Sequence, residues 1–217
     1  MLTSNYKNFN GNDYREISIS GDRGKEVNYK GEFYSQLAPK HAFWEIWHYN
    51  IGKISEEENT RYYVENYYKQ VLSKLDPDEV YHDLQDKILL CYEEPTEFCH
   101  RHIVAEWIQL LFEVEVPEIK LIDNKFQKTD RIEGLGPLLE KVIRENTVNM
   151  RGFTSLKALR LFEKGEKIEA KACELEEKTG KDYGDMHFQA AGLRVQADDA
   201  EDEYKQLHSK PNGRVLK

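Results

Sequence analysis

Cysteine is scarce in this sequence. Three cysteines, Cys91, Cys99 and Cys173, occur among 217 residues. Their odd number and irregular spacing exclude the disulfide framework of small secreted proteins. We therefore expect free thiols and a reducing, cytoplasmic location.

Long hydrophobic runs are also missing. A membrane-spanning helix needs about 20 consecutive, mostly apolar residues, and no segment approaches that length. Residues 1–13 are too polar for a secretory signal. The sequence therefore predicts no membrane insertion, in agreement with the expected cytoplasmic location.

An excess of positive charge is the third absence. Lysine and arginine together number 31 against 40 aspartates and glutamates, which gives a formal net charge of -9. Proteins that bind phosphate backbones regardless of sequence need clustered lysine and arginine that release counterions. We therefore expect no nonspecific nucleic-acid binding.

The composition that remains is that of a folded protein. Hydrophobic residues make up 39%, aromatic residues 12% and charged residues 33% of the chain. This balance is typical of a globular protein with a strongly charged surface, not of a disordered chain. Because domains commonly run to about 100–150 residues, the chain has room for one domain and an extension.

Strand and helix patterns alternate in the first part of the chain. Residues 16–20 alternate apolar and small polar side chains, and residues 87–92 form the continuous apolar run of a central strand. Further patterns predict helices at residues 41–49, 55–75, 76–85 and 102–112 and a short strand at residues 119–122. Because helical crossovers connect parallel strands, we predict a three-layer α/β domain with a mainly parallel sheet over residues 1–150.

Tyrosine is abundant within the predicted helices. Six tyrosines fall within residues 49–81. Tyrosine rings commonly pack on apolar surfaces with their hydroxyl groups in water. We interpret them as packing residues and assign them no site.

The last third of the chain has a different pattern. Residues 153–207 contain no proline and no strand pattern, and Gly180 divides two helical stretches. Small and apolar residues recur at spacings of three, four and seven, which predicts an α-helical hairpin over residues 151–217. The hairpin either folds back on its own chain or joins a second copy, as a homodimer, or another protein through residues 153–207. We interpret the acidic run at residues 198–203 as a solvated face and not as a metal site.

One segment, residues 91–102, is dense in residues that can carry chemistry. Cys91 and Glu93 lie at the end of the predicted central strand, and Cys99, His100 and Arg101 lie at the start of the next helix. In open α/β sheets, ligands bind outside the carboxyl ends of the strands. The two sets of side chains are therefore expected to face one crevice.

Each of these residue types has a possible task in that crevice. At a helix start, free backbone N–H groups stabilise negative charge, so Cys99 is a candidate thiolate nucleophile. His100 is a candidate proton carrier, and Glu93 would orient the histidine or act as a base. Arg101, with Arg23 as a second cation, would bind an anion, and Cys91 completes the predicted ligand-binding set.

The same segment resembles a known family. Residues 89–93 and 97–107 look like the signature of the domain of unknown function 488 (DUF488) family, and weaker similarity extends over residues 1–115. The resemblance implies an α/β domain with a site carried by Cys91, Glu93, Cys99, His100 and Arg101. It also implies that Asp22 and Arg23 are the counterpart of an acidic-arginine pair of the family. It implies no particular reaction.

Three hypotheses remain open from the sequence. The first is an enzyme that uses Cys99 or His100 on an anionic or nucleotide-like small molecule; a phosphatase is excluded because Arg101 follows the cysteine too closely. The second is a metal site formed by Cys91, Cys99 and His100 or His102, although seven residues separate the cysteines, so we expect no cofactor. The third is a binding protein that recruits a partner through its helical tail.

Overall fold

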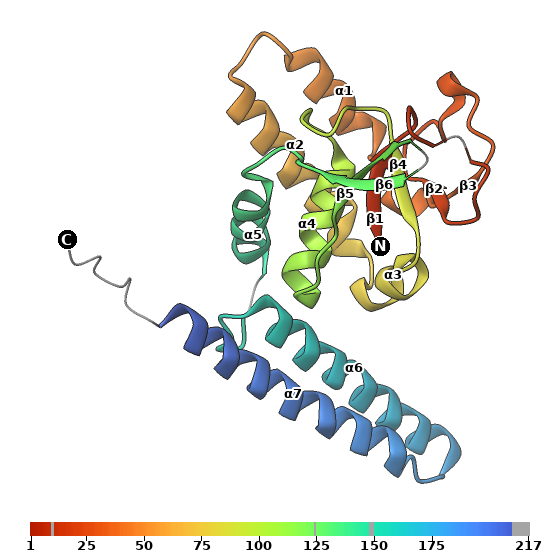
Figure 1. Ribbon diagram of the computed structural model, residues 1–217. Helices are drawn as coiled ribbons and strands as arrows, with labels where there is room; N and C mark the ends of the chain where they lie inside the picture. The colour runs from red at the N-terminus through yellow and green to blue at the C-terminus, as the bar shows by residue number, and fades with distance from the viewer. Residues whose placement is uncertain (10, 124, 148–149, 210–217) are drawn as a thin grey trace. The chain divides into compact units, whose positions relative to one another are not determined.

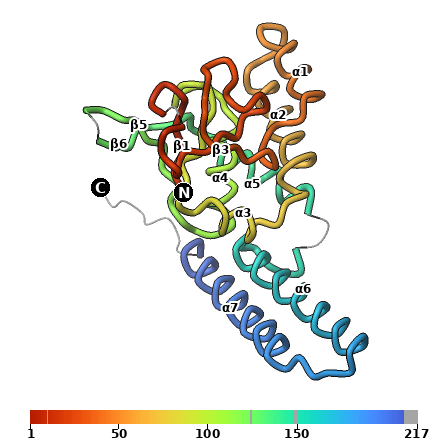
Figure 2. Tube along the Cα trace, turned by 90° about the vertical axis from the view of Figure 1, so that its right-hand side faces the viewer, coloured from red at the N-terminus to blue at the C-terminus, as the bar shows by residue number. Residues whose placement is uncertain are grey.

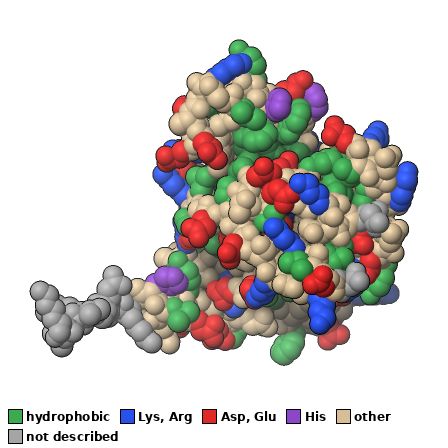
Figure 3. All heavy atoms as spheres, turned by 45° about the horizontal axis from the view of Figure 1, so that its top comes forward, with side chains coloured by type: hydrophobic (Ala, Val, Ile, Leu, Met, Phe, Trp, Pro, Cys, Tyr) green, Lys and Arg blue, Asp and Glu red, His purple; other side chains and the backbone are tan. Residues whose placement is uncertain are grey.

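The computed structural model describes residues 1–9, 11–123, 125–147 and 150–209. The chain divides into two compact units, Met1–Asn146 and Thr147–Lys217. Charged side chains of both signs are spread over the face drawn in Figure 3, as the composition predicts. Within the described residues, no helix combines the length and the apolar composition needed to cross a bilayer.

A mainly parallel sheet forms the centre of the first unit (Figure 1). Within the described residues it has six strands in the order β3-β2-β4-β1-β5-β6. The strands are β1 (Leu2–Asn5), β2 (Glu16–Ser18), β3 (Glu32–Phe33), β4 (Ile88–Cys91), β5 (Glu118–Ile122) and β6 (Lys125–Thr129). The pairings among the first five strands are parallel, and β6 runs antiparallel to β5. The predicted α/β class with a mainly parallel sheet is confirmed.

Five α-helices accompany the sheet in the described part of this unit. They are α1 (His41–Asn50), α2 (Glu56–Gln70), α3 (Pro77–Leu84), α4 (His100–Phe112) and α5 (Leu135–Asn146). Helix α4 packs on β1 and β4, and α5 packs on α2 and α4. Local chemistry sets several helix starts: Ser55 Oγ accepts a hydrogen bond from the Glu58 N–H, and Asp76 caps α3 directly before Pro77.

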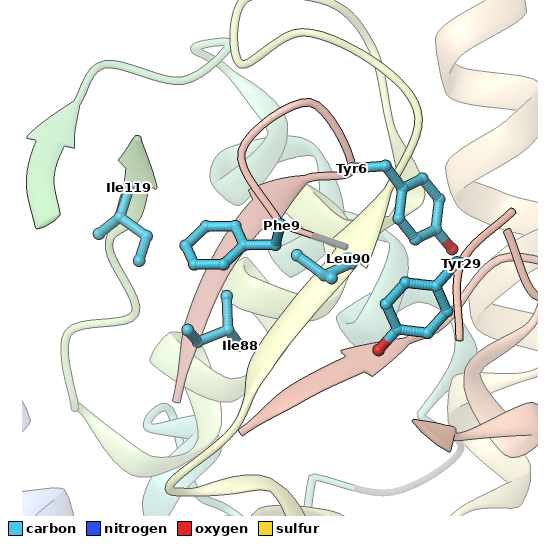
Figure 4. Packing of buried hydrophobic residues seen from close by; sticks show 6 residues of the cluster. All are labelled: Tyr6, Phe9, Tyr29, Ile88, Leu90 and Ile119. Atoms are coloured by element: carbon cyan, nitrogen blue, oxygen red, sulfur yellow. The ribbon is translucent and has the colours of Figure 1, made fainter. Parts of the chain in front are cut away.

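The central strand β4 separates two buried environments. All four of its residues are buried, as its apolar run predicts. Ile88 and Leu90 pack with Tyr6, Phe9 and Tyr29 on one face of the sheet (Figure 4). Because side chains alternate along a strand, Cys91 points to the opposite face, where α4 lies.

Several elements of the first unit differ from the prediction, and strands β3 and β6 are among those not predicted. The helix predicted over residues 55–75 ends at Gln70 and gives way to a 3₁₀ turn, Leu72–Lys74. Helix α5 was not predicted, although its buried residues follow a helical stripe. Strand β1 was not predicted because most of its side chains are polar; they are buried nonetheless, and Ser4 Oγ donates to the carbonyl of Ile119 at 2.7 Å.

The second unit is a pair of long helices, drawn side by side in Figure 2. Helix α6 (Leu156–Thr179) ends at Gly180, whose φ of 66° is the left-handed cap that glycine favours, and α7 (Gly184–His208) returns along it. Small residues fill the seam, and a Cβ added to Gly165 would lie 3.0 Å from the carbonyl oxygen of Ala190. The predicted hairpin is confirmed, whereas association of residues 153–207 with a partner stays a prediction.

The acidic run of α7 is only partly a solvated face. Four of its carboxylates are exposed, but Glu201 is buried. The Glu201 carboxylate accepts hydrogen bonds from the N–H groups of Thr154 and Ser155, at 2.8 Å each, directly before α6. Glu201 therefore caps the facing helix of the hairpin.

Candidate functional site

The predicted crevice lies where β4 ends and α4 begins. Cys91 is the last residue of β4, Cys99 is the N-cap residue of α4, and His100 is its first residue. The loop that follows β2 meets them there, because the carboxyl ends of parallel strands share one edge of the sheet. The structure therefore brings Cys91, Cys99 and His100 together, as the sequence predicts.

His100 lies between the two sulfur atoms and the sheet. Its Nδ1 is 3.7 Å from Cys91 Sγ and 3.9 Å from Cys99 Sγ, and its Nε2 is 3.0 Å from the carbonyl oxygen of Ile19. A carbonyl only accepts hydrogen bonds, so Nε2 carries a proton. The Nδ1 atom is left to exchange a proton with the sulfur atoms.

The two thiols have opposite electrostatic environments. Burial by itself disfavours the Cys99 thiolate, but the Cys91 thiol, Arg101 and His100 together hold the pKa of Cys99 well below its usual range. Burial raises the pKa of Cys91, and Cys99 raises it further. For His100, burial lowers the pKa, but the charge and hydrogen bond of Cys99, the Glu93 charge and the Ile19 carbonyl together outweigh burial and raise the pKa. The arrangement favours a Cys99 thiolate paired with a His100 imidazolium.

Arg101 points away from this pair into the protein core. It is fully buried, with its Nη2 3.0 Å and its Nε 3.2 Å from Glu118 Oε1 on β5. His102 Nε2 lies 3.4 Å from the other oxygen of Glu118. Burial lowers the pKa of Arg101, but Cys99 and Glu118 more than compensate and raise it. Arg101 therefore acts on Cys99 as a fixed charge and is not placed to clamp a ligand.

A cavity of about 610 Å³ opens beside Cys99 and His100. Its size lies within the range of small-molecule sites. Aromatic rings form much of its wall, from Trp44, Trp47, Tyr63, Tyr92 and Phe98. The prediction assigned the tyrosines of this region no site and did not consider the other rings for one, because only the fold brings α1, α2 and the loop after β4 together.

Glu93 also lines this cavity. Burial raises the pKa of its carboxyl to about 7, and the Cys99 charge adds to the effect. Its Oε2 lies 3.9 Å from Arg101 Nη1. A carboxyl that titrates near neutral pH can both give and take a proton, which fits the predicted acid/base role.

The predicted second cation, Arg23, is not brought to the cavity. Its guanidinium carbon lies 3.8 Å from the centre of the Phe33 ring, and its neighbour Asp22 lines the cavity instead. Asp22 accepts hydrogen bonds from Ser20 Oγ, the Gly24 N–H and Tyr92 Oη. Burial raises the pKa of Asp22, but these donors outweigh it and lower the pKa. Of the predicted pair Asp22 and Arg23, it is therefore the aspartate that lines the cavity.

The two cysteines and the histidine of the site form a set that can hold a metal ion. The ligand atoms of Cys91, Cys99 and His100 lie within 4.8 Å of one another, a set that suits zinc. His102 is not part of this set and lies against Glu118 instead. A second such group in the described residues, Glu169, Cys173 and His187, lies in the hairpin, where His187 is hydrogen-bonded to two carboxylates.

Comparison with known proteins gives one result. Residues 7–110 match a family model described as "Active DUF488-N3 subclade". The match includes every residue predicted for the site and ends before Glu118. No curated protein and no solved structure matches the chain.

Proposed function

Since the chain belongs to the DUF488 family, we propose that its first unit is an enzyme in which Cys99 attacks a small, nucleotide-like molecule. The observation that carries this proposal is the position of Cys99 and His100 at the wall of an aromatic cavity. A low-pKa thiol beside a histidine is the arrangement of an activated nucleophile. The family description, which names an active subclade, agrees with a catalytic role.

The surrounding residues divide the remaining tasks. When the Cys99 sulfur bonds to an electrophilic carbon of the substrate, the bond from that carbon to the leaving group breaks, and the Nδ1 proton of His100 passes to the leaving group. Glu93 is a second proton carrier, since burial raises its pKa to about 7. Arg101 is a positioning residue: its buried charge stabilises the Cys99 thiolate without touching the ligand.

The cavity fits the nucleotide-like part of the predicted ligand better than the anionic part. Its aromatic walls suit a flat heterocycle, which stacks on rings such as Trp47. Among the described residues, no lysine or arginine lines the cavity, so the predicted arginine clamp has no place in it. We therefore propose a planar heterocyclic substrate. Since the mechanism requires reduced thiols, we also propose a cytoplasmic location.

The pH dependence of cysteine alkylation tests this proposal. Iodoacetamide reacts with thiolates, and peptide mass spectrometry resolves Cys99 from Cys173, an exposed thiol that serves as an internal control. We expect alkylation of Cys99 to persist at pH values where that of Cys173 has already fallen. For each cysteine we compare the pH at which the alkylation rate is half its maximum, called its alkylation midpoint. This comparison removes the effect of the low exposure of Cys99, which is 3% and slows its alkylation at every pH.

Two variants complete this experiment. His100→Gln should move the Cys99 midpoint to higher pH, because the imidazolium that stabilises the thiolate is gone. His82→Gln is the matched control, since the His82 side chain is 83% exposed. Equal midpoints for Cys99 and Cys173 in the unaltered protein would show that Cys99 is no activated nucleophile.

A further inference from the structure

We propose that the cavity selects a ligand with a positive charge on or beside its planar ring. This inference rests on the proposed function only for the position of the ligand, next to Cys99. It reverses the charge that the sequence predicted for the ligand. The reasons are the carboxylates and the aromatic rings of the wall, and the placement of Arg23 and Arg101 outside the lining.

Three carboxylates line the cavity from two loops. Asp22 and Glu26 belong to the loop after β2, and Glu93 belongs to the loop after β4. Both loops leave the carboxyl ends of parallel strands, so the acids stand on neighbouring parts of one rim. Among the described residues of the lining, only histidines are basic. A phosphate or carboxylate would meet repulsion here, whereas a cation would be attracted.

Asp22 is held in place as an anion. Its Oδ1 accepts hydrogen bonds from Ser20 Oγ at 2.9 Å and from the Gly24 N–H at 3.0 Å, and its Oδ2 accepts from Tyr92 Oη. These donors fix the carboxylate without neutralising its charge. The negative charge on this side of the cavity is therefore present before any ligand arrives.

The two histidines of the lining do not offset these acids. The positive charge of His100 is balanced by the Cys99 thiolate beside it. His41 lies 3.3 Å from Glu45, a carboxylate of its own helix. Arg101, whose Nη1 lies 3.9 Å from Glu93 Oε2, offsets part of the Glu93 charge. The negative charge that a ligand meets therefore comes chiefly from Asp22 and Glu26.

The aromatic wall favours the same kind of ligand. Trp47 packs with Tyr63 and Phe98 at ring-centroid distances of 5.3 Å and 5.5 Å, and Tyr63 and Phe98 are 5.0 Å apart. The electron-rich face of an aromatic ring attracts a cation, and tryptophan does so most strongly. A wall that combines such rings with carboxylates is therefore suited to a cationic heterocycle.

Three probes of similar shape and different charge test this inference on the full chain. They are 1-methylquinolinium, neutral 1-methylnaphthalene and anionic 1-naphthoate, measured by calorimetry and by quenching of tryptophan fluorescence. We expect the cation to bind at least about tenfold more tightly than the neutral probe, and the anion most weakly, since charge and ring attraction act together. Equal affinities, or tighter binding of the anion, would overturn the inference.

Protection of Cys99 locates the bound probe. The cation should slow alkylation of Cys99 but not of Cys173, which lies in the other unit. Glu26→Gln should weaken the preference for the cation, while Glu57→Gln, the same change at an exposed residue of α2, should leave it unchanged. Unchanged cation preference in Glu26→Gln together with unprotected Cys99 would place the probe elsewhere and refute the site.

This experiment separates the inference from the proposed function. If Cys99 has a low alkylation midpoint but the probes bind equally, the enzyme proposal stands and the charge preference fails. If the cation binds and protects Cys99 but the midpoint equals that of Cys173, the cavity is a binding site without an activated nucleophile.

Discussion

The buried pair of Arg101 and Glu118 is predicted to have two separable roles, one in stability and one in the reactivity of Cys99. Both side chains are fully buried, with three nitrogen–oxygen contacts of 3.0–3.3 Å between them. Glu118→Ala leaves the Arg101 charge buried without its partner. Breaking such a pair typically costs about 3–5 kcal/mol, a large share of the roughly 5–15 kcal/mol that stabilises a domain.

Replacing both residues gives a different expectation. In the double variant Arg101→Met, Glu118→Leu both charges of the pair are removed together, and apolar side chains fill a similar volume. Such replacements are often neutral for stability, so the double variant should unfold near the denaturant concentration of the unaltered protein. Its Cys99 alkylation midpoint should nevertheless move to higher pH, because the Arg101 charge that lowers the pKa of Cys99 is gone.

Urea unfolding followed by tryptophan fluorescence measures the stability effect in the correct unit. All three tryptophans, Trp44, Trp47 and Trp107, lie in the first unit, so the hairpin contributes no tryptophan signal. A loss below about 1 kcal/mol in Glu118→Ala would mean that the pair behaves like an exposed ion pair. An unchanged Cys99 midpoint in the double variant would show that Arg101 does not support the thiolate.

The pair also predicts how stability depends on pH. Burial raises the pKa of Glu118, but His102 and Arg101 outweigh it and lower the pKa. Its contribution is therefore complete above the ordinary glutamate pKa of about 4.3 and is lost as pH falls through the lower value of the folded protein. The stability difference between the unaltered protein and Glu118→Gln should accordingly shrink as pH falls below that value.

Three further predictions concern the hairpin, the metal content and association. Glu201→Ala should lower the free energy of unfolding of the second unit by about 1–3 kcal/mol, because the N–H groups of Thr154 and Ser155 lose their acceptor. Unfolding followed by far-ultraviolet circular dichroism checks this. Glu203→Ala, the same change at an exposed residue, is the control. Purified protein should contain no stoichiometric zinc or iron by elemental analysis, and an equivalent of either would favour a metal site at Cys91, Cys99 and His100. If residues 153–207 form the predicted homodimer, the substitutions Phe188→Ser and Val195→Ser at exposed positions should lower the mass measured by light scattering from that of a dimer toward that of a monomer.

The position of the site could be predicted from the sequence because it depends on local order along the chain. A continuous apolar run fixes β4, and the pattern after residue 102 fixes α4, so Cys91 and His100 fall at the facing ends of two elements. The roles of the arginines could not be predicted in this way. Arg101 is matched by Glu118, which lies 17 residues later on β5, a strand that pairs with β1. Arg23 is turned toward Phe33, which is 10 positions later in the sequence.

The start of α4 explains how three consecutive residues come to have three different functions. Cys99 is the extended N-cap residue before the helix, and the helical side chains of His100 and Arg101 point about 100° apart, so those two diverge. Cys99 and His100 both line the cavity, and the Nε2 atom of His100 also reaches the Ile19 carbonyl. Arg101 enters the core toward β5. A buried arginine would be costly alone, and Glu118 makes it tolerable. Because Arg101 stabilises the thiolate from inside the protein, the cavity wall does not need a cation for that purpose. The wall can therefore carry acids, and in our proposal these acids select a positively charged ligand.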